Sequence, residues 1–376
     1  MTSEQLQDHH NKLHNTNWKH IKLDDIITLE YGKGLTKESR DNGEYPVYGS
    51  NGIVGYHSDF LIEGPVIIVG RKGTVGAISW SKCNCWPIDT TYYVKKKGSE
   101  IDYCWLYYKL KSLALSKLNM ATGIPGLNRD HVYSTNIQLP PIPEQHKIAS
   151  ILSKVDEHIF HTEAIIEKTE ELKRGLMQQL LTKGIGHTKF KNTEIGEIPE
   201  EWDVIKLKEL IALEYGKALN KDSRKDGKYP VYGSNGLIGY HSSYLVEGPA
   251  IIVGRKGTVG AINISDSSCW PIDTTYYIST NENNVHTRWL FYKLKYLKLS
   301  NLNMATGVPG INRDMVYAQS VVLPPLIEQR KIALIISKID DHLALNQNYL
   351  SKIKELKQGL MQDLLMGKVK VDTKCY

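Results

Sequence analysis

The chain has 376 residues, of which 41% are hydrophobic and 23% charged, a balance typical of folded proteins that argues against long disordered stretches. It has no apolar run of the roughly 18 residues that a spanning helix needs, and its first residues are polar, which excludes a membrane helix and a secretory signal. We therefore expect a cytoplasmic protein. A net charge of +6 and a pI near 8.8 favour a polyanionic partner without requiring one.

The chain contains an internal repeat at a constant offset. The 34 residues of 45–78 recur at 229–262 with six exchanges, an offset of 184. Later matching segments begin at Cys85 and Cys269, Asn119 and Asn303, Leu139 and Leu323, and Glu171 and Glu355. A period this long is not that of a solenoid. We predict two copies of one unit, fused head to tail.

Each copy divides into a globular part and a long helix. Runs such as VIIVG and TVGAISW, separated by glycine-rich turns, predict strands and hairpins. An amphipathic helix over 102–118 and an irregular loop follow them. The predicted fold class is α+β. In chain order we expect a polar tail (1–17), a globular domain (18–142), a long helix (143–184), a second globular domain (185–326), a second long helix (327–368) and a C-terminal tail (369–376).

The two long helices carry apolar residues at alternating steps of four and three, from Ile148 to Leu180 and again from Ile332 to Leu364. This spacing predicts an antiparallel coiled coil with pseudo-twofold symmetry. Leu172 and Leu356 continue the stripes in this interpretation. The polar residues Thr162 and Asn346 share one seam position, where a polar side chain often fixes the register.

Such a pair of helices would hold two equivalent faces apart. About 38 helical residues span roughly 57 Å, or about 17 base pairs of duplex DNA. Duplex DNA is the commonest ligand that offers two like sites to a twofold protein. DNA is therefore the first candidate partner.

Three repeated polar loops supply the candidate DNA-contacting residues. They are Ser50 and Asn51, Arg71, Lys72 and Thr74, and Thr122, Asn128 and Arg129, with their counterparts Ser234, Asn235, Arg255, Lys256, Thr258, Thr306, Asn312 and Arg313. In VGRKGTVGAI, a hairpin turn with flanking glycines would let the backbone approach phosphate, and arginine can bind guanine through two hydrogen bonds. The alternative is a solvated basic turn.

The other two loops also have structural alternatives. The Ser-Asn-Gly sequence forms turns on its own account. An ion pair from Arg129 to Asp130, or from Arg313 to Asp314, would hold the third loop together instead of contacting DNA. The repeated DTTYY segment alternates like a half-buried strand, and we interpret it as core.

No metal or catalytic residue is expected. The five cysteines lack the spacing of a zinc site or a disulfide framework and are expected to be reduced, and His57 and His241 stand alone. GRKGTVG matches neither a dinucleotide-binding loop nor a P-loop. In LPPIP and LPPLI, Leu139 and Leu323 occupy the place of the amide or carboxylate of an amino-methyltransferase loop, where leucine cannot accept a hydrogen bond.

The chain resembles the specificity subunits of type I restriction-modification enzymes. The resemblance covers nearly the whole chain and rests on its repeated segments. LPPIPEQHKIASILSKVDEHI and LPPLIEQRKIALIISKIDDHL enter the long helices, LKRGLMQQLLTKG and LKQGLMQDLLMGK leave them, and TEIGEIPEEWDVIKL opens the second globular domain. The first copy keeps Trp18 but lacks IGEIP.

The resemblance implies a non-catalytic subunit with two target-recognition domains, each reading half of a bipartite site in double-stranded DNA. It implies docking of two modification subunits, with restriction subunits as further partners. It places methylation and S-adenosylmethionine on the modification subunit, so no cofactor is expected here. Because the two domains are near copies, we predict an interrupted palindrome as target. A protein-binding scaffold and a self-contained DNA-modifying enzyme are the alternatives.

Overall fold

The computed structural model describes residues 17–118, 126–280, 284–302 and 310–373. These residues form two compact units. The first contains the described residues up to Glu163 together with those from Asn348 on, and the second is Ala164–Gln347. Two long helices, α4 (Ile142–Leu180) and α8 (Leu326–Leu365), pass from one unit into the other. Each unit therefore contains the start of one long helix and the end of the other.

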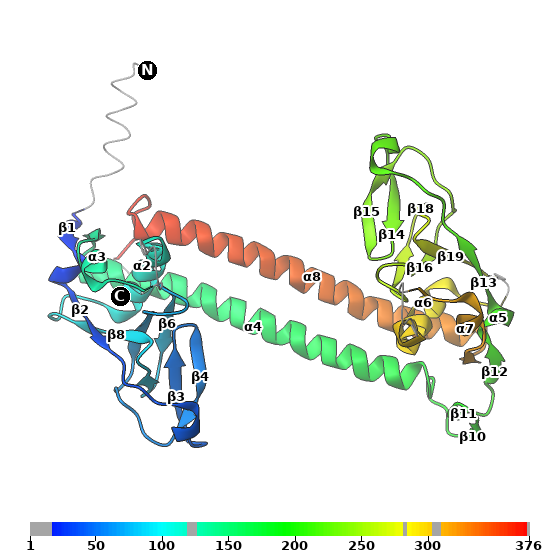
Figure 1. The fold of residues 1–376 in the computed structure, drawn as a ribbon, viewed down its shortest axis with the longest axis horizontal. Helices are drawn as coiled ribbons and strands as arrows, with labels where there is room; N and C mark the ends of the chain where they lie inside the picture. The colour runs from blue at the N-terminus through cyan, green and yellow to red at the C-terminus, as the bar shows by residue number, and fades with distance from the viewer. Residues whose placement is uncertain (1–16, 119–125, 281–283, 303–309, 374–376) are drawn as a thin grey trace, which may run out of the picture. The chain divides into compact units, whose positions relative to one another are not determined.

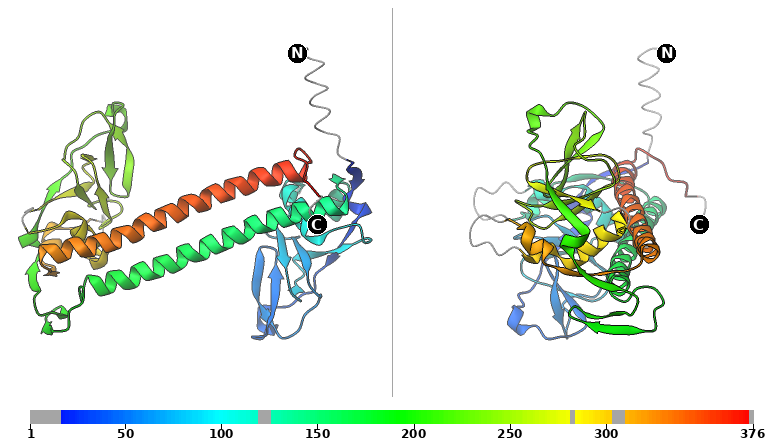
Figure 2. Two further views of the ribbon diagram at one scale, coloured as in Figure 1. Left: turned by 180° about the vertical axis from the view of Figure 1, so that it is seen from behind. Right: turned by 90° about the vertical axis from the view of Figure 1, so that its right-hand side faces the viewer.

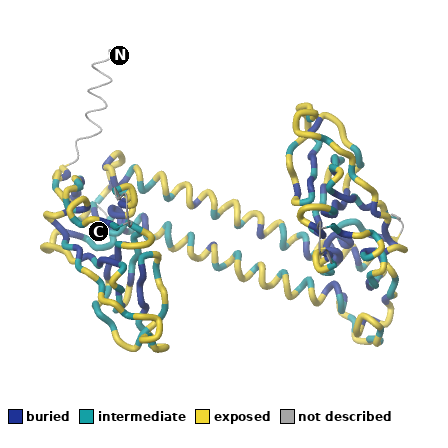
Figure 3. The backbone as a smooth tube through the Cα atoms, in the orientation of Figure 1, coloured by how far each residue is buried: buried dark blue, intermediate teal, exposed yellow. Residues whose placement is uncertain are grey.

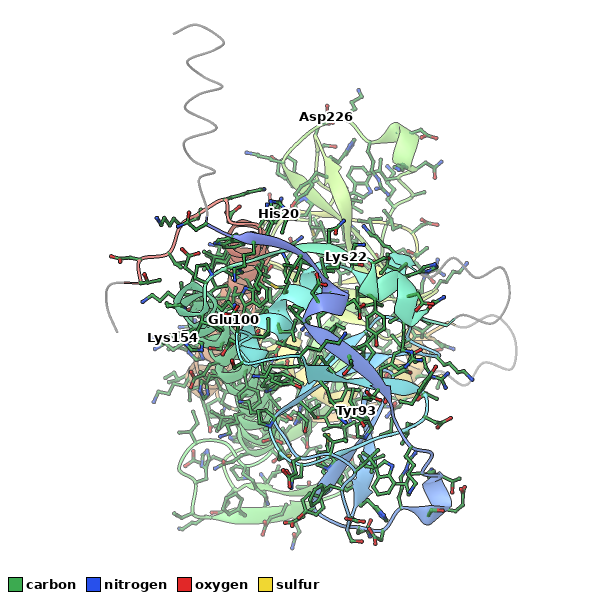
Figure 4. The ribbon with its side chains drawn as sticks, turned by 90° about the vertical axis from the view of Figure 1, so that its left-hand side faces the viewer. His20, Lys22, Tyr93, Glu100, Lys154 and Asp226 are labelled. Carbon is green, nitrogen blue, oxygen red and sulfur yellow. The ribbon has the colours of Figure 1, made fainter. Side chains whose placement is uncertain are left out.

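The first unit is built on small sheets (Figure 1). A four-stranded antiparallel sheet has the order β2 (Ile27–Tyr31), β8 (Thr91–Lys96), β5 (Val66–Gly70), β6 (Ile78–Ser81). A three-stranded sheet has the order β4 (Gly52–His57), β3 (Tyr45–Gly49), β7 (Trp86–Pro87), and β1 (Lys19–Lys22) pairs with β9 (Asn136–Leu139). Figure 4 labels His20 and Lys22 on β1 and Tyr93 on β8.

The second unit repeats this topology. Its sheets are β13 (Ile211–Tyr215), β19 (Thr275–Thr280), β16 (Ala250–Gly254), β17 (Ile262–Ser265); β15 (Gly236–His241), β14 (Tyr229–Gly233), β18 (Trp270–Pro271); and β12 (Asp203–Lys206) with β20 (Ser320–Leu323). A hairpin of β10 (Phe190–Thr193) and β11 (Gly196–Pro199) contains the TEIGEIP segment, whose sequence the first copy lacks. The predicted α+β class and the duplication are confirmed.

Short helices complete each unit. They are α2 (Tyr103–Ser112), α3 (Arg129–Tyr133), α5 (Leu207–Leu210), α6 (Thr287–Leu297) and α7 (Arg313–Tyr317), with 3-10 turns at Leu23–Asp25, Lys37–Ser39, Leu115–Leu118, Lys221–Ser223 and Leu299–Leu302. Asp102 begins α2 by accepting a hydrogen bond from Trp105 N at 2.6 Å. The helix predicted through 118 ends at Ser112, because Ala114 has φ 47°. No helix in the described parts of the chain is long and apolar enough to cross a bilayer.

Each long helix completes a hydrophobic core at both of its ends. In the first unit, the core around Trp105 includes Leu152 from α4 and Leu364 and Leu365 from the end of α8. Figure 3 shows the buried backbone gathered in the globular parts and the exposed backbone along the long helices. The described ends of the chain both belong to this unit (Figure 2). The second unit is built in the same way, with Leu180 from the end of α4 and the following Leu181 in its core.

A tryptophan at the start of each globular domain fixes the start of a long helix. Trp18 Nε1 donates to Glu144 Oε2 at 2.5 Å, and Trp202 Nε1 donates to Glu328 Oε2 at 2.8 Å. Both glutamates lie in the first helical turn, where a carboxylate also interacts favourably with the helix dipole.

The two helical segments within each unit run antiparallel. In the first unit, Lys357 on α8 pairs with Asp156 on α4, and Lys354 pairs with Glu163 at 2.7 Å. Residue numbers therefore rise along α4 as they fall along α8. In the second unit, Lys173 on α4 pairs with Asp340 on α8. This is the repeat of the pair between Lys357 and Asp156, with the lysine now on α4 and the aspartate on α8.

The polar seam residues are satisfied within their own helices. Thr162 Oγ1 donates to His158 O at 2.7 Å, and Asn346 Nδ2 donates to His342 O at 2.9 Å. The prediction that Leu172 and Leu356 extend the seam is wrong, since both are 55% exposed. A straight helix drifts by about 20° per heptad from a 3.5-residue repeat, which carries these positions out of the interface.

Candidate nucleic-acid interface

The basic GRKG segment lies in a loop between β5 and β6. Strand β5 ends at Gly70 and β6 begins at Ile78, so the predicted tight hairpin turn is a wider loop. The Arg71 and Lys72 amides both donate to Thr90 O, at 2.9 and 3.1 Å. Gly73 has φ +77°, a conformation that favours glycine. The backbone of the loop is thus anchored while Lys72 remains exposed.

The three predicted DNA-contacting loops converge at this segment. The tip of the β3–β4 hairpin reaches it, with Ser50 Oγ accepting from Thr74 N at 3.4 Å, while Asn51 is exposed. The segment leading to α3 also joins it, because Leu127 N donates to Arg71 O at 2.9 Å. Tertiary structure therefore gathers residues far apart in the sequence onto one surface.

The second copy makes the corresponding contacts. Ile311 N donates to Arg255 O at 3.1 Å, and the Arg255 and Lys256 amides both donate to Thr274 O. Lys256, Thr258 and Asn235 are exposed. Ser234 stands at the same hairpin tip, where its Oγ would lie 3.1 Å from a Cβ added at Gly257.

An exposed tyrosine contacts two arginines in the first copy. The Arg71 and Arg129 guanidinium carbons are 5.2 and 4.7 Å from the centre of the Tyr31 ring. Tyr31 ends β2 and is 50% exposed. Arg71 NH2 donates to the carbonyl of Asp89 at 2.6 Å, and Arg129 NH1 to that of Leu29 at 3.3 Å. We call Tyr31, Arg71 and Arg129 the first Arg-Tyr cluster.

The second copy holds the same arrangement. Arg255 and Arg313 lie 5.3 and 4.0 Å from the centre of the Tyr215 ring, and Tyr215 is 55% exposed. Arg255 NH2 donates to Asp273 O at 2.6 Å. Tyr215, Arg255 and Arg313 form the second Arg-Tyr cluster.

The arginines of the clusters have no carboxylate partner among the described residues. Their partners there are backbone carbonyls and aromatic rings. Tyr92, 5.1 Å from Tyr31, lies beneath the first cluster and is 3% exposed. Burial raises the pKa of Tyr92 to about 12, so its phenol is neutral. Such a surface can bind an anion and stack a planar group.

Asn128 and Asn312 have a structural position. Each side-chain oxygen accepts a hydrogen bond at 2.8 Å, from the amide of Asp130 or Asp314, and so caps α3 or α7. Among the described residues, Arg129 forms no ion pair with Asp130 and Arg313 none with Asp314; Arg129 NH1 instead donates to the Leu29 carbonyl. Thr122 and Thr306 lie outside the described residues.

The strand residues of the DTTYY segment form core, as predicted, whereas its first residue, Asp89, is exposed. Thr91 is fully buried and Tyr92 nearly so, and Thr275 and Tyr276 repeat this in the second copy. Tyr93 faces the other side of β8 and packs on a small cluster that contains Cys85. Burial raises the pKa of the Cys85 and Cys269 thiols to about 11, which keeps them protonated and unreactive.

The structure also gives positions for the isolated histidines. His57 Nδ1 lies 2.9 Å from Asp41 Oδ1, and His241 Nδ1 accepts from Lys225 N at 3.0 Å. In the part of the chain that the structure describes, no three His, Cys, Asp or Glu side chains gather as a metal site would require.

Sequence reasoning missed the two exposed tyrosines. The signal was available, because LEYGK recurs without change at 29–33 and 213–217. An aromatic residue before a glycine, repeated without change, marks a candidate contact, but only the folded chain places Arg71 and Arg129 over its ring.

Comparison with known proteins gives consistent relatives. The family model described as the type I restriction modification DNA specificity domain matches residues 15–174 and 199–355. The MjaVIII specificity subunit of a type I restriction enzyme from Methanocaldococcus jannaschii is 28% identical, over 94% of this chain and 93% of its own. A putative type I specificity subunit of Mycoplasma pneumoniae is 25% identical, over 91% and 94%.

A solved structure shares the fold. The crystal structure of the type I restriction-modification S subunit from M. genitalium aligns with a TM-score of 0.74 and 20% identity, covering 96% of this chain and 98% of its own. The family model covers most of the chain in two matches, one for each copy of the repeat. The chain therefore belongs to the type I restriction-modification DNA specificity domain family.

Proposed function

We propose that this protein is the DNA sequence-recognition subunit of a type I restriction-modification complex, and that each Arg-Tyr cluster contacts one half of a bipartite duplex target. The observation that carries the proposal is the recurrence of the cluster, with the same residue types, packing and unpaired charge, in both copies. A surface repeated in this way suits a ligand that presents the same chemistry twice.

Each residue of the proposed DNA surface contacts a different part of the DNA. A guanidinium can bind a phosphate or the O6 and N7 atoms of guanine, and Tyr31 limits the orientations of Arg71 and Arg129. Lys72 supplies a further phosphate contact, and Asn51 at the hairpin tip can reach a base edge. Arg255, Lys256 and Asn235 act alike in the second half-site. Thr74 and Thr258 remain candidates for contact with the sugar-phosphate backbone of the DNA.

The target is an interrupted palindrome in this proposal. The loops that build the two surfaces are nearly identical in sequence, so like domains select like half-sites. Two like half-sites on opposite DNA strands form an inverted repeat, and we expect the gap between them to be fixed.

The helices supply docking sites for two modification subunits. Ile165 and Leu172 on α4 are 46% and 55% exposed, and their counterparts Tyr349 and Leu356 on α8 are 52% and 55% exposed. The support for this assignment is that the same exposed apolar positions recur on both helices. We assign methylation, with S-adenosylmethionine, to these subunits and cleavage to restriction subunits, so that this chain is non-catalytic and acts in the cytoplasm.

The test is selection from a randomised duplex library by the chain together with its cognate modification subunit, followed by sequencing of the retained DNA. We expect an enriched inverted repeat with a constant gap, and an affinity that falls steeply between 50 and 200 mM salt as counterions are released, as expected for several phosphate contacts. Two unlike half-sites would contradict the palindrome alone. No enrichment, with salt-insensitive binding, would contradict DNA recognition and favour a protein scaffold.

A further inference from the structure

A β-bulge interrupts the β3–β4 hairpin beside the candidate interface. Tyr48 pairs with Ile53 and Val47 pairs with Gly55, which leaves Val54 as an extra residue. The second copy repeats the bulge at Ile238 on β15. Bulges re-aim side chains and are frequent next to functional sites.

The bulge leaves two adjacent apolar side chains in solvent. Along a regular strand, successive side chains point to opposite faces. Here Ile53 and Val54 are 51% and 45% exposed, and Leu237 and Ile238 are 51% and 40% exposed. The exact residues differ between the copies, but their apolar character and exposure do not. We call Ile53–Val54 and Leu237–Ile238 the apolar pairs.

An arginine holds each bulge in place. Arg40 NH1 donates to the carbonyl of Val54 at 2.9 Å while NH2 donates to that of Leu35 at 3.1 Å. In the second copy, Arg224 NH1 donates to Ile238 O at 2.8 Å. A carbonyl that the bulge removes from the ladder is thus satisfied, which makes the bulge an ordered part of the fold.

The apolar pair lies near the segment that binds the first Arg-Tyr cluster. A Cβ added at Gly49 would meet Val54 Cγ1 at 2.8 Å and Ile88 Cδ1 at 3.8 Å, so these two side chains cover the same glycine. The residue after Ile88 is Asp89, whose carbonyl accepts from Arg71. Strand β4 is also the edge of its sheet, which leaves the hairpin free to enter a groove.

We propose that each apolar pair contacts the methyl group of a thymine in the major groove of its half-site. The inference rests on the proposed function. The major groove admits a two-stranded ribbon, and the thymine 5-methyl is the one apolar group that the base pairs present there. The adjacent arginines suit the phosphates that flank such a base. Each half-site therefore contains a thymine.

The test replaces thymine with deoxyuridine, one position at a time, in the selected duplex. This change removes only the methyl group. For the chain bound to its modification subunit, we expect one position in each half-site where affinity falls about fourfold, the value of one buried methyl group. In the variant with Ile53→Ala, Val54→Ala, Leu237→Ala and Ile238→Ala, thymine and uracil at that position should bind equally.

Ile195→Ala is the matched control. Ile195 is an exposed apolar residue (41%) in the β10–β11 hairpin, and its loss should leave the preference for thymine intact. Half-sites without thymine would overturn this proposal alone. So would a preference for thymine over uracil that persists in the variant with all four alanine substitutions. Absence of binding to any duplex would overturn the proposed function as well.

Discussion

The Tyr108 hydroxyl donates a hydrogen bond to Asp156 Oδ2 at 2.7 Å, joining the first globular domain to the start of α4. Asp156 also pairs with Lys357 from the end of α8, so one carboxylate connects three elements of the unit. Burial, and then the neighbouring carboxylate, raises the pKa of Tyr108. The second unit repeats the arrangement, with Tyr292 donating to Asp340 at 2.8 Å.

The first prediction concerns this carboxylate. Asp156→Asn keeps an oxygen that can accept from Tyr108 but removes the charge facing Lys357. We expect unfolding in urea to become easier by about 1–2 kcal/mol, because a charged partner strengthens both contacts. Glu163→Gln, which breaks a more exposed ion pair with Lys354, is the control and should cost less than about 1 kcal/mol. Equal losses in the two variants would contradict this role.

The second prediction tests the exposed tyrosines. Tyr31→Ala combined with Tyr215→Ala removes the ring that orients two arginines in each copy. We expect DNA affinity to fall by about tenfold or more, since cation–π contacts and base stacking contribute on the order of 1 kcal/mol each. Fluorescence anisotropy with the selected duplex measures this. Tyr31→Phe combined with Tyr215→Phe should retain most of the affinity. If the alanine and the phenylalanine variants both lose affinity, the hydroxyl contributes to binding. If neither loses affinity, the ring does not contribute.

The third prediction separates phosphate contact from a solvated turn. With Arg71→Ala and Arg255→Ala, the slope of log affinity against log salt should become shallower by about two, roughly one for each phosphate that the protein no longer binds. Lys168→Ala, at an exposed position of α4, should leave the slope unchanged. An unchanged slope together with an unchanged affinity would establish the solvated-turn alternative, whereas an unchanged slope with weaker affinity would assign the arginines to a base.

The fourth prediction concerns the caps. Asn128→Ala should destabilise the first unit by about 1 kcal/mol through loss of the α3 cap, while Asn128→Ser should restore most of that loss. If capping is its only role, DNA affinity of the folded protein stays at the wild-type value. A weakened affinity in the stable serine variant would instead assign Asn128 to the DNA surface.

The fifth prediction concerns a buried lysine. Lys109 is 6% exposed and donates to Leu365 O at 2.8 Å at the end of α8. Burial lowers the pKa of Lys109 from 10.5 to about 8. Between these values the unfolded chain binds more protons than the folded one, so this lysine contributes stability that grows from pH 8 to pH 10.5 and is lost as pH falls.

Urea unfolding of the wild type and of Lys109→Met across this range measures the contribution, because other titrating groups cancel in the difference. The difference in unfolding free energy should rise with pH in favour of the wild type. Lys293, which donates to Leu181 O in the second unit, offers a repeat of the test. A difference that stays constant with pH would contradict the lowered pKa.

The repeat made the fold largely predictable. A constant offset implied two like units before any strand was assigned, and the sheets of the two units follow one order. Local signals failed where tertiary contacts decide. The helix expected through 118 ends at Ser112, and Leu172 leaves the seam because small angular errors accumulate along a long helix.

The candidate site was predictable only in part. Arg71 and Lys72 stood out by composition. Tyr31 becomes a candidate contact only because two arginines, 40 and 98 residues away in the chain, pack on its ring in the folded protein. Asn128 precedes a short helix and is a typical capping residue, a local signal that competes with the DNA interpretation. The bulge beside Ile53 has no sequence signal of its own, because it is a property of how two strands pair.

The exchange of helix ends between the units has a consequence for synthesis on the ribosome. The second unit, Ala164–Gln347, is one continuous segment and can complete its core as soon as it has emerged. The first unit cannot, because Leu364, Leu365 and Val371 belong to its core. The domain that is translated first is thus the last to finish folding. A premature stop after residue 347 would shorten the C-terminus but leave the core of the N-terminal domain incomplete.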